Sequence, residues 1–124
     1  AELTDQPTIN NPNVVKVVRG GNGKALYFSR QPIPHGAGPK DCASVKEAGF
    51  PILRHIGVYG FARDTLLRIP NLPSSGLAEI ESLEQLRFLE NDIQMHVLDA
   101  QGSPWGIETR ADYDSYLQRL TANA

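Results

Sequence analysis

A glycine-rich tetrad between two short apolar runs constrains the fold of this chain more than any other sequence feature. Residues 14–18 are mostly β-branched, residues 20–23 have the sequence Gly-Gly-Asn-Gly, and residues 25–29 include Leu, Tyr and Phe. Glycine and asparagine tolerate the positive φ angles of tight hairpin turns, and β-branched and aromatic residues favour strands. The sequence therefore predicts a β-hairpin with strands at 14–18 and 25–29.

The rest of the chain alternates between predicted helix, strand and loop, with no internal repeat. Residues 1–13 are polar and contain two prolines, which predicts an extended leader that packs little. Residues 30–51 are broken by prolines and glycines and form a long loop with a short helix at 43–48. The elements predicted after this loop are a strand at 52–61, helices at 63–69 and 77–91, a strand at 95–98 and a helix at 109–120. This order predicts an α/β fold for residues 14–124.

Two of these helices have recognisable N-terminal caps. Ser74 or Ser75 precedes the helix at 77–91, and serine accepts hydrogen bonds from the first free N–H groups of a helix. Thr109 and Asp112 fit a capping box, in which the two residues bond each other's backbone. The helix that follows this capping box has its apolar side chains on one side, at Tyr113, Tyr116, Leu117 and Leu120.

The composition limits the class of protein. The chain has 124 residues, which suits one domain. Its 12 basic and 14 acidic residues give a net charge of −2, whereas proteins that bind nucleic acid through its phosphates carry an excess of basic residues. The single Cys42 excludes an internal disulfide, and no apolar run approaches the roughly 20 residues of a membrane-spanning helix. We therefore expect a cytoplasmic protein with neither nucleic acid nor membrane as partner. The sequence starts at Ala1 without methionine or signal pattern, as a fragment or trimmed chain does.

Three common kinds of site do not fit the residue spacing. Gly23-Lys24 lacks the upstream glycine and the following Ser or Thr of a phosphate-binding loop. The three histidines have no zinc-ligand spacing to one another or to the cysteine. No G-x-S-x-G nucleophile elbow occurs.

The first candidate site lies on the predicted strand at 52–61. The two-residue period places His55, Gly57 and Tyr59 on one face, where the missing side chain of glycine leaves room beside two hydrogen-bonding aromatic groups. This face is either a small-molecule contact surface or an ordinary half-buried strand face.

Two acidic residues are further candidates. On the helical period, the neighbours of Glu84 are Leu77, Ile80 and Phe88, so its carboxylate is expected to point inward. An inward carboxylate needs a polar partner, which is either a ligand or an arginine of the protein. Glu108 stands before the capping box, where it is either a ligand or metal contact at a strand end or a simple helix-terminal acid.

Four stretches of the sequence together resemble the second half of the CMP-Kdo synthetase family, the 3-deoxy-manno-octulosonate (Kdo) cytidylyltransferases of lipopolysaccharide biosynthesis. They are NPNVVKVVRGGNGKALYFSRQPIP, ILRHIGVYGF, EIESLEQLRFLEN and GIETRADYDSYLQRL. Their order and intervals also agree, so the resemblance covers most of the chain. It implies the carboxy-terminal half of a Rossmann-like nucleotidyltransferase fold, with the β-hairpin belonging to a smaller dimerisation sheet.

The resemblance also implies roles for residues in the matching motifs. It places Tyr59, Glu84 and Gln85 in contact with the sugar acid, with His55 and Arg30 as further contacts to the sugar or its carboxylate. It identifies no catalytic residue in this part of the fold. Where the family has a Mg²⁺-binding aspartate in the motif G-V-D-T, this chain has the longer Glu108.

The family's amino-terminal half, which holds the CTP triphosphate, has no counterpart in this sequence. The resemblance therefore implies that residues 14–124 form the sugar-binding and dimerisation part of a homodimeric enzyme that transfers CMP from CTP to Kdo, with Mg²⁺ offsetting phosphate charge. Alternatives are a non-catalytic sugar-acid-binding or dimerisation module, and a related enzyme that activates another acidic sugar. The family pattern is least well kept at 35–50 and at 60–63, where an arginine is expected directly after the aromatic residue.

Overall fold

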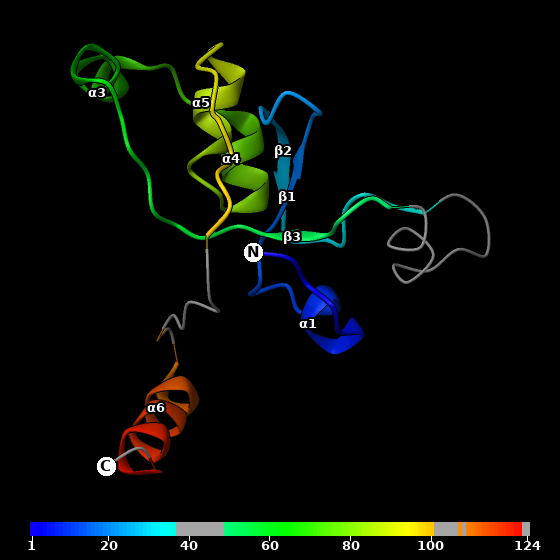
Figure 1. The fold of residues 1–124 in the computed structure, drawn as a ribbon. Helices are drawn as coiled ribbons and strands as arrows, with labels where there is room; N and C mark the ends of the chain where they lie inside the picture. Colours follow the sequence, from blue (N-terminus) through cyan, green and yellow to red (C-terminus); the bar gives the residue numbers. More distant parts are fainter. Residues whose placement is uncertain (37–48, 101–106, 108, 123–124) are drawn as a thin grey trace.

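The computed structural model describes residues 1–36, 49–100, 107 and 109–122. Its strands form one antiparallel sheet in the order β2-β1-β3, and helices lie around it (Figure 1). The elements are α1 (Gln6–Asn10), β1 (Lys16–Arg19), β2 (Ala25–Ser29), β3 (Leu53–Arg54), α3 (Arg63–Arg68), the 3₁₀ turn η1 (Ile69–Asn71), α4 (Gly76–Glu81), α5 (Leu86–Glu90) and α6 (Arg110–Ala122). The predicted α/β class is confirmed. No helix in this part of the chain has the length and apolarity needed to cross a membrane.

The predicted hairpin is present as β1 and β2. Its register pairs Val17 with Phe28, and it is irregular between Val18 and Arg19. Gly23 has a φ of +80°, as the turn requires, and its N–H donates to the carbonyl of Gly20 at 2.9 Å. Local turn chemistry and strand propensity therefore suffice to define this unit.

The predicted strand at 52–61 is much shorter in the structure. β3 contains only Leu53 and Arg54, which pair with β1. Beyond it the chain folds back in a three-residue turn centred on Gly57, in which the N–H of Val58 donates to the carbonyl of Ile56 at 2.7 Å. The expectation of a continuous strand is wrong because these backbone groups bond locally instead of to a neighbouring strand.

The segment predicted as a strand at 95–98 is an isolated bridge between His96 and Lys24. Two backbone hydrogen bonds flank this bridge: the N–H of Ala25 donates to Met95 at 2.8 Å, and the N–H of Val97 donates to Gly23 at 2.8 Å. The segment therefore runs along the turn end of the hairpin but is too short to form a strand.

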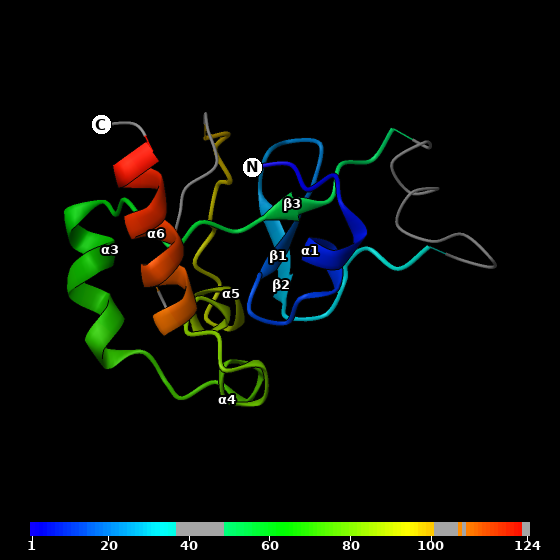
Figure 2. The ribbon, with the colours of Figure 1, turned by 90° about the horizontal axis from the view of Figure 1, so that it is seen from below.

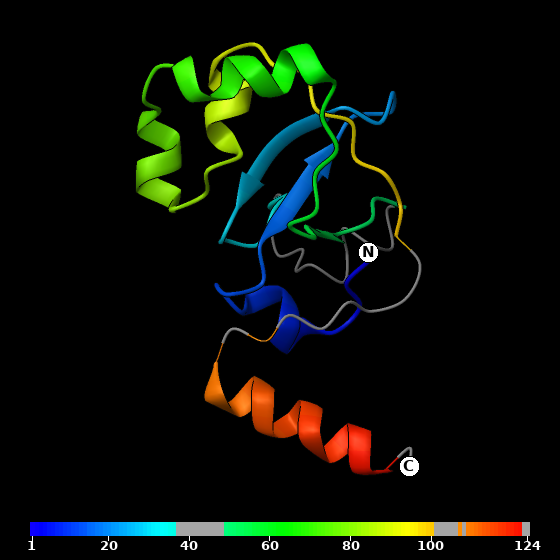
Figure 3. The same ribbon diagram turned by 90° about the vertical axis from the view of Figure 1, so that its left-hand side faces the viewer.

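The main core lies between the hairpin and the α4–α5 region. Its buried residues are Val17, Ala25, Phe28, Leu53, Leu83 and Leu86. Leu86 is completely buried, and α5 packs against β2. Figure 3 shows α4 and α5 beside the same end of the hairpin. Burial of apolar surface at this contact stabilises the short elements, none of which would persist alone.

Residues 1–13 pack against the sheet, so the expectation of an extended leader that packs little is wrong. They contain α1, whose cap residue Asp5 accepts a hydrogen bond from the N–H of Thr8 at 2.9 Å. Leu3 and Ile9 are buried against Ile52 in a second cluster. Figure 2 shows α1 next to the hairpin and β3. Apolar residues at two positions of a mostly polar segment are enough to anchor it.

The predicted helix at 77–91 is two short helices. Ser75 caps α4, accepting from the N–H of Ala78 at 3.0 Å, as predicted. However, α4 ends at Ser82, which adopts the left-handed conformation with φ 52° and ψ 49°. Such a residue stops an α-helix, so the residues after it leave the helical period on which the sequence argument depended. α5 then begins at Leu86.

The two remaining helix predictions are confirmed. α3 covers Arg63–Arg68, and the proline at 70 lies in η1, which follows at once. The capping box of α6 is formed in both directions: the N–H of Thr109 donates to the Asp112 carboxylate at 2.8 Å, and the N–H of Asp112 donates to the Thr109 hydroxyl at 3.2 Å. The short helix predicted at 43–48 lies outside the described residues.

Candidate functional site

A cavity of about 750 Å³ lies between two segments that pass over the sheet. Residues 53–62 provide one wall and residues 92–100 provide another, and side chains of β1 and β2 contribute Val17 and Phe28. The two segments can be followed as green and yellow ribbon in Figure 3. A cavity of this volume is in the range that binds small molecules.

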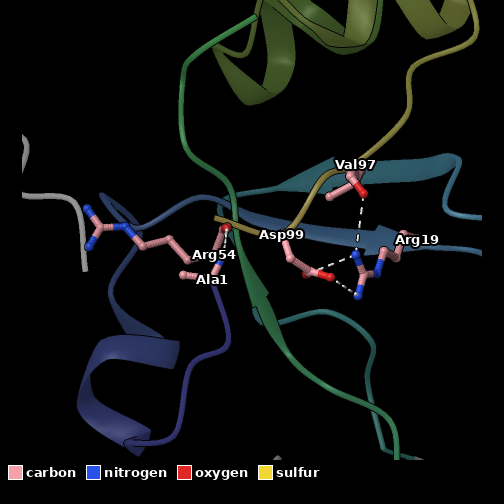
Figure 4. A network of polar contacts seen from close by, with 5 residues as sticks. All are labelled: Ala1, Arg19, Arg54, Val97 and Asp99. Atoms are coloured by element: carbon pink, nitrogen blue, oxygen red, sulfur yellow. Dashed lines mark hydrogen bonds and ion pairs between the residues drawn. The ribbon is translucent and has the colours of Figure 1, made fainter. Parts of the chain in front are cut away.

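At one end of this cavity, Arg19 of β1 contacts the segment 92–100. Its guanidinium pairs with the carboxylate of Asp99 at 3.0 Å and donates to the carbonyl of Val97 at 3.3 Å (Figure 4). Asp99 and Val97 both line the cavity. These contacts connect the wall formed by 92–100 to the hairpin, although the Asp99 side chain is largely exposed.

The polar centre of the cavity wall is a hydrogen-bonded pair of aromatic residues. The hydroxyl of Tyr59 lies 2.9 Å from Nε2 of His55, and both residues line the cavity. The ring of His55 meets Phe28 edge-on at 5.1 Å, and the ring of Tyr59 stacks on Phe61 at 6.1 Å. Phe88 of α5 contacts Tyr59 and Phe61 edge-on, at 6.4 and 5.6 Å. These contacts hold the pair in place against the core.

Both members of the pair are uncharged at neutral pH. Burial lowers the pKa of His55 below its usual value of 6.5. Burial, and then the nearby Glu84 carboxylate, raise the pKa of Tyr59 to about 12. Two neutral groups share this hydrogen bond, and the histidine tautomer decides which of them donates. The pair therefore offers hydrogen bonds rather than charge to a ligand.

Two members of the predicted His55-Gly57-Tyr59 face, His55 and Tyr59, are brought together, but by a turn rather than by a strand face. A four-residue separation in an extended strand spans about 13 Å, which excludes a direct hydrogen bond. The turn at Gly57 closes that distance. Gly57 itself is exposed and does not line the cavity, so the open space around it is solvent and is not evidence for the ligand space expected there.

Glu84 is exposed, so the expectation of an inward carboxylate is wrong. The reason is the helix break at Ser82, which changes the direction of the side chains after it. Glu84 lines a separate, shallow cavity of about 540 Å³ together with Arg87. After burial, its carboxylate is the second cause of the raised pKa of Tyr59.

Gln85 is 5% exposed, and its Nε2 has no hydrogen-bond partner among the described residues. A buried amide nitrogen without a partner is costly, because its N–H groups lose their water. Gln85 directly precedes α5, the helix that contacts Tyr59 through Phe88. Gln85 is thus the predicted site residue with a buried, unpartnered donor, but it lines neither of the two cavities.

Arg30 binds the protein and does not line the large cavity. Its guanidinium donates to three backbone carbonyls: Glu81 at 2.8 Å, Pro12 at 3.1 Å and Ser82 at 3.2 Å. The structure thus separates Arg30 from the His55–Tyr59 pair. Arg30 instead joins the end of α4 to the hairpin and to the N-terminal segment.

Two structurally important charged residues were not identified from the sequence. The carboxylate of Glu81 accepts from the Ser29 hydroxyl at 2.7 Å and from the backbone N–H of Arg30 at 3.0 Å. Lys16 is completely buried, and its Nζ donates to the carbonyls of Asn11, Val14 and Arg30. The only sequence signal for Lys16 was a lysine in the middle of an apolar strand.

The described residues alone do not form a metal site. Among them, no three His, Cys, Asp or Glu side chains lie together in a way that could hold an ion. The predicted metal ligand Glu108 lies outside the described residues.

Comparisons with known proteins place these features in one family. The cytidylyltransferase family profile matches residues 1–95. Curated relatives named 3-deoxy-manno-octulosonate cytidylyltransferase include those of Acidobacterium capsulatum, 47% identical over 90% of this chain and 43% of the relative, and Cellvibrio japonicus, 46% identical over 91% of this chain and 44% of the relative.

A solved structure of CMP:2-keto-3-deoxy-manno-octonic acid synthetase complexed with CTP superposes with a TM-score of 0.81 and 29% identity, over 98% of this chain and 47% of that one. The chain thus spans less than half the length of these relatives. The family profile covers more than half of the chain, and the resemblance to CMP-Kdo synthetases seen in its motifs is confirmed. The chain belongs to the cytidylyltransferase family.

Proposed function

We propose that this chain forms the sugar-binding part of a 3-deoxy-manno-octulosonate cytidylyltransferase, which transfers CMP from CTP to Kdo and releases pyrophosphate. The names of the matching relatives support the reaction. The observation that supports the site is the neutral Tyr59–His55 pair, held at 2.9 Å on the wall of a cavity of about 750 Å³. Hydroxyl groups of a sugar acid are suitable partners for such a pair.

In the proposed reaction, the anomeric hydroxyl oxygen of Kdo forms a bond to the α-phosphorus of CTP. The bond from this phosphorus to the oxygen bridging to the β-phosphate breaks, pyrophosphate leaves with the electron pair, and the hydroxyl proton passes to solvent. The role proposed for Tyr59 and His55 is to bind and orient the sugar, which lowers the entropic cost of the attack.

Gln85 and Glu84 are also proposed as sugar contacts, as the family resemblance implies. Neither residue lines the cavity of the Tyr59–His55 pair: Gln85 is buried with an unpartnered Nε2, and Glu84 is exposed on the second cavity. Arg30 is a weaker candidate for a sugar contact, because three backbone carbonyls already occupy its guanidinium. Its contribution in this proposal is to position the end of α4.

Mg²⁺ is proposed as the cofactor of the complete reaction, with Glu108 contributing one carboxylate. Since the described residues do not themselves form a metal site, no step of the mechanism is routed through the ion. Replacing Glu108 with Gln in the complete protein should raise the Mg²⁺ concentration required for half-maximal turnover. An unchanged requirement would remove Glu108 from the proposal.

The assembly and location of the complete enzyme are also proposals. This chain is proposed to form the carboxy-terminal half of a Rossmann-like nucleotidyltransferase fold, and CTP is proposed to bind in the part of the relatives that this chain does not match. The hairpin is proposed as the homodimer contact, as the family resemblance implies, and Leu26 of β2 is exposed there. The location is proposed to be the cytoplasm.

The direct test uses the protein encoded by the open reading frame that contains this sequence. Supplied with CTP, Mg²⁺ and Kdo, it should release pyrophosphate only when the sugar is present. Release with another sugar acid but not with Kdo would favour a related enzyme. Binding of Kdo without any pyrophosphate release would favour a non-catalytic module, and the absence of both would refute the assignment.

A further inference from the structure

The carboxylate of Glu81 links two elements that are far apart in the sequence. Its oxygens accept from the Ser29 hydroxyl at 2.7 Å and from the backbone N–H of Arg30 at 3.0 Å. In return, the guanidinium of Arg30 donates to the backbone carbonyl of Glu81 at 2.8 Å. Ser29 is the last residue of β2 and Glu81 is the last residue of α4, so these contacts hold the ends of β2 and α4 together.

These hydrogen bonds are partly shielded from water. Ser29 is 3% exposed, and Glu81 is half-buried. Hydrogen bonds to a carboxylate are roughly twice as strong as those between neutral groups. Burial, and then the Glu81 carboxylate, raise the pKa of Tyr27, which lies two positions before Ser29 in β2. Residues two apart share one face of a strand, so Glu81 acts on β2 at two neighbouring positions.

The two elements that Glu81 links lead to the aromatic residues on either side of the Tyr59–His55 pair. Phe28, the residue before Ser29 in β2, meets the ring of His55 edge-on at 5.1 Å. Phe88 of α5, which packs against α4, meets the ring of Tyr59 edge-on at 6.4 Å. Because the pair contacts both phenylalanine rings, its geometry depends on how β2 and the α4–α5 region are placed relative to each other.

The segment that carries the pair has little regular structure of its own. The N–H of His55 donates to the carbonyl of Val15 at 2.9 Å, and the N–H of Val58 donates within the turn to Ile56. In the described parts of the chain, no backbone hydrogen bond joins residues 57–61 to the sheet or to a helix. The placement of Tyr59 relative to His55 therefore depends on aromatic side-chain contacts.

We propose that Glu81 is a positioning residue for the Tyr59–His55 pair. By holding β2 to the end of α4, its carboxylate sets the spacing between Phe28 and Phe88, and the pair lies between these two rings. Glu81 does not line the cavity, so it acts through other residues and not by contact with a ligand. The consequence for the sugar rests on the proposed function: the affinity for Kdo should depend on Glu81, whereas the affinity for CTP should not.

The test compares two glutamates of similar chemistry in the protein encoded by the open reading frame that contains this sequence. Glu90 also accepts from a serine hydroxyl, that of Ser75, and from a backbone N–H, that of Leu77, but these contacts stay within the α4–α5 region. Glu90→Ala is therefore the matched control for Glu81→Ala. Glu81→Gln is a milder second variant, since glutamine keeps one acceptor oxygen, and it decides the test if Glu81→Ala does not fold.

The first readout is the NMR spectrum of the His55 ring, recorded without substrates. The ring current of Phe28 makes the His55 resonances sensitive to the distance between the two rings. Both Glu81 variants should move these resonances, the alanine variant further than the glutamine variant, whereas Glu90→Ala should leave them in place. Unchanged His55 resonances in the Glu81 variants, or an equal movement in Glu90→Ala, would overturn the positioning role.

The second readout is calorimetric titration with Kdo and, separately, with CTP. Glu81→Ala should weaken Kdo binding about fivefold and leave CTP binding within about twofold, and Glu90→Ala should leave both within about twofold. An equal loss of Kdo affinity in the two alanine variants, or an equal loss for Kdo and CTP in Glu81→Ala, contradicts the proposal. If the wild-type protein does not bind Kdo, the proposed function fails, whereas a movement of the His55 resonances confined to the Glu81 variants still supports the positioning role.

Discussion

Replacing Lys16 with Met should destabilise the chain strongly, because Lys16 is buried and joins three parts of the backbone. Its Nζ donates to the carbonyls of Asn11 and Val14, which precede β1, and of Arg30, which follows β2. Methionine preserves most of the volume of the side chain but donates no hydrogen bond. The variant therefore isolates the polar contribution of the ammonium group.

The magnitude follows from two opposing terms. Three hydrogen bonds from a charged donor contribute about 1.5–3 kcal/mol each, whereas removing a buried charge returns several kcal/mol of desolvation free energy. The net loss should be about 3 kcal/mol in the free energy of unfolding. With a urea m-value of about 1–3 kcal/mol/M, the unfolding midpoint should fall by roughly 1–3 M at unchanged m.

Circular dichroism during urea titration measures this change. The matched control is Lys24→Met, in the turn of the same hairpin, where the structure shows no side-chain hydrogen bond to the described residues; its effect should stay below about 1 kcal/mol. A change of less than 1 kcal/mol for Lys16→Met, or an equal change for both variants, would refute the role given to Lys16.

Three smaller predictions concern other positions in the fold. Ser82→Gly should stabilise the chain by about 0.5–1 kcal/mol, measured by urea unfolding, since Ser82 has a φ of 52° that glycine adopts without strain; a loss of stability would contradict this. Glu81→Ala should cost about 2 kcal/mol in the same assay, because the Ser29 hydroxyl and the Arg30 N–H lose their acceptor. The pKa of His55 is lower in the folded chain than in the unfolded chain, so the unfolded chain binds a proton at His55 more readily. The contribution of His55 to stability is therefore complete above about pH 6.5 and falls as the pH drops below that value. His55→Gln should reduce this slope in unfolding measured from pH 7.5 to 5, and an unchanged slope would show that other groups cause it.

The elements that could be predicted from sequence are those fixed by local chemistry. The Gly-Gly-Asn-Gly tetrad defines its hairpin because the turn requires a residue at positive φ, which Gly23 supplies. The Thr109–Asp112 capping box likewise forms within four residues, and it starts α6 at the expected position. Neither prediction needed information about distant parts of the chain.

The errors arose where a single residue changed the local geometry. Ser82 adopts the left-handed conformation, which serine rarely does, and the residues around it do not predict this conformation. The periodic argument that pointed Glu84 inward failed at that residue. Gly57 is a second case: it lies in an exposed turn and not on the ligand-contacting face of a strand.

The long-range polar contacts could not be predicted because their partners are far apart in the sequence. Ser29 and Glu81 are separated by 52 positions, and no pattern in a single sequence connects them. The strand period and the resemblance to cytidylyltransferases both indicated Tyr59 and His55, and the structure adds their hydrogen bond and the cavity beside them.

The central claim, that the Tyr59–His55 cavity binds an acidic sugar, is tested most directly by calorimetric titration of Kdo into the protein that contains this chain. We predict that Tyr59→Phe weakens binding about fivefold, as expected for the loss of one hydrogen bond of about 1 kcal/mol. Tyr113→Phe, at a tyrosine that is equally exposed but lies on α6, should leave the affinity unchanged. No binding by the wild-type protein, or the same loss in both variants, would contradict the claim.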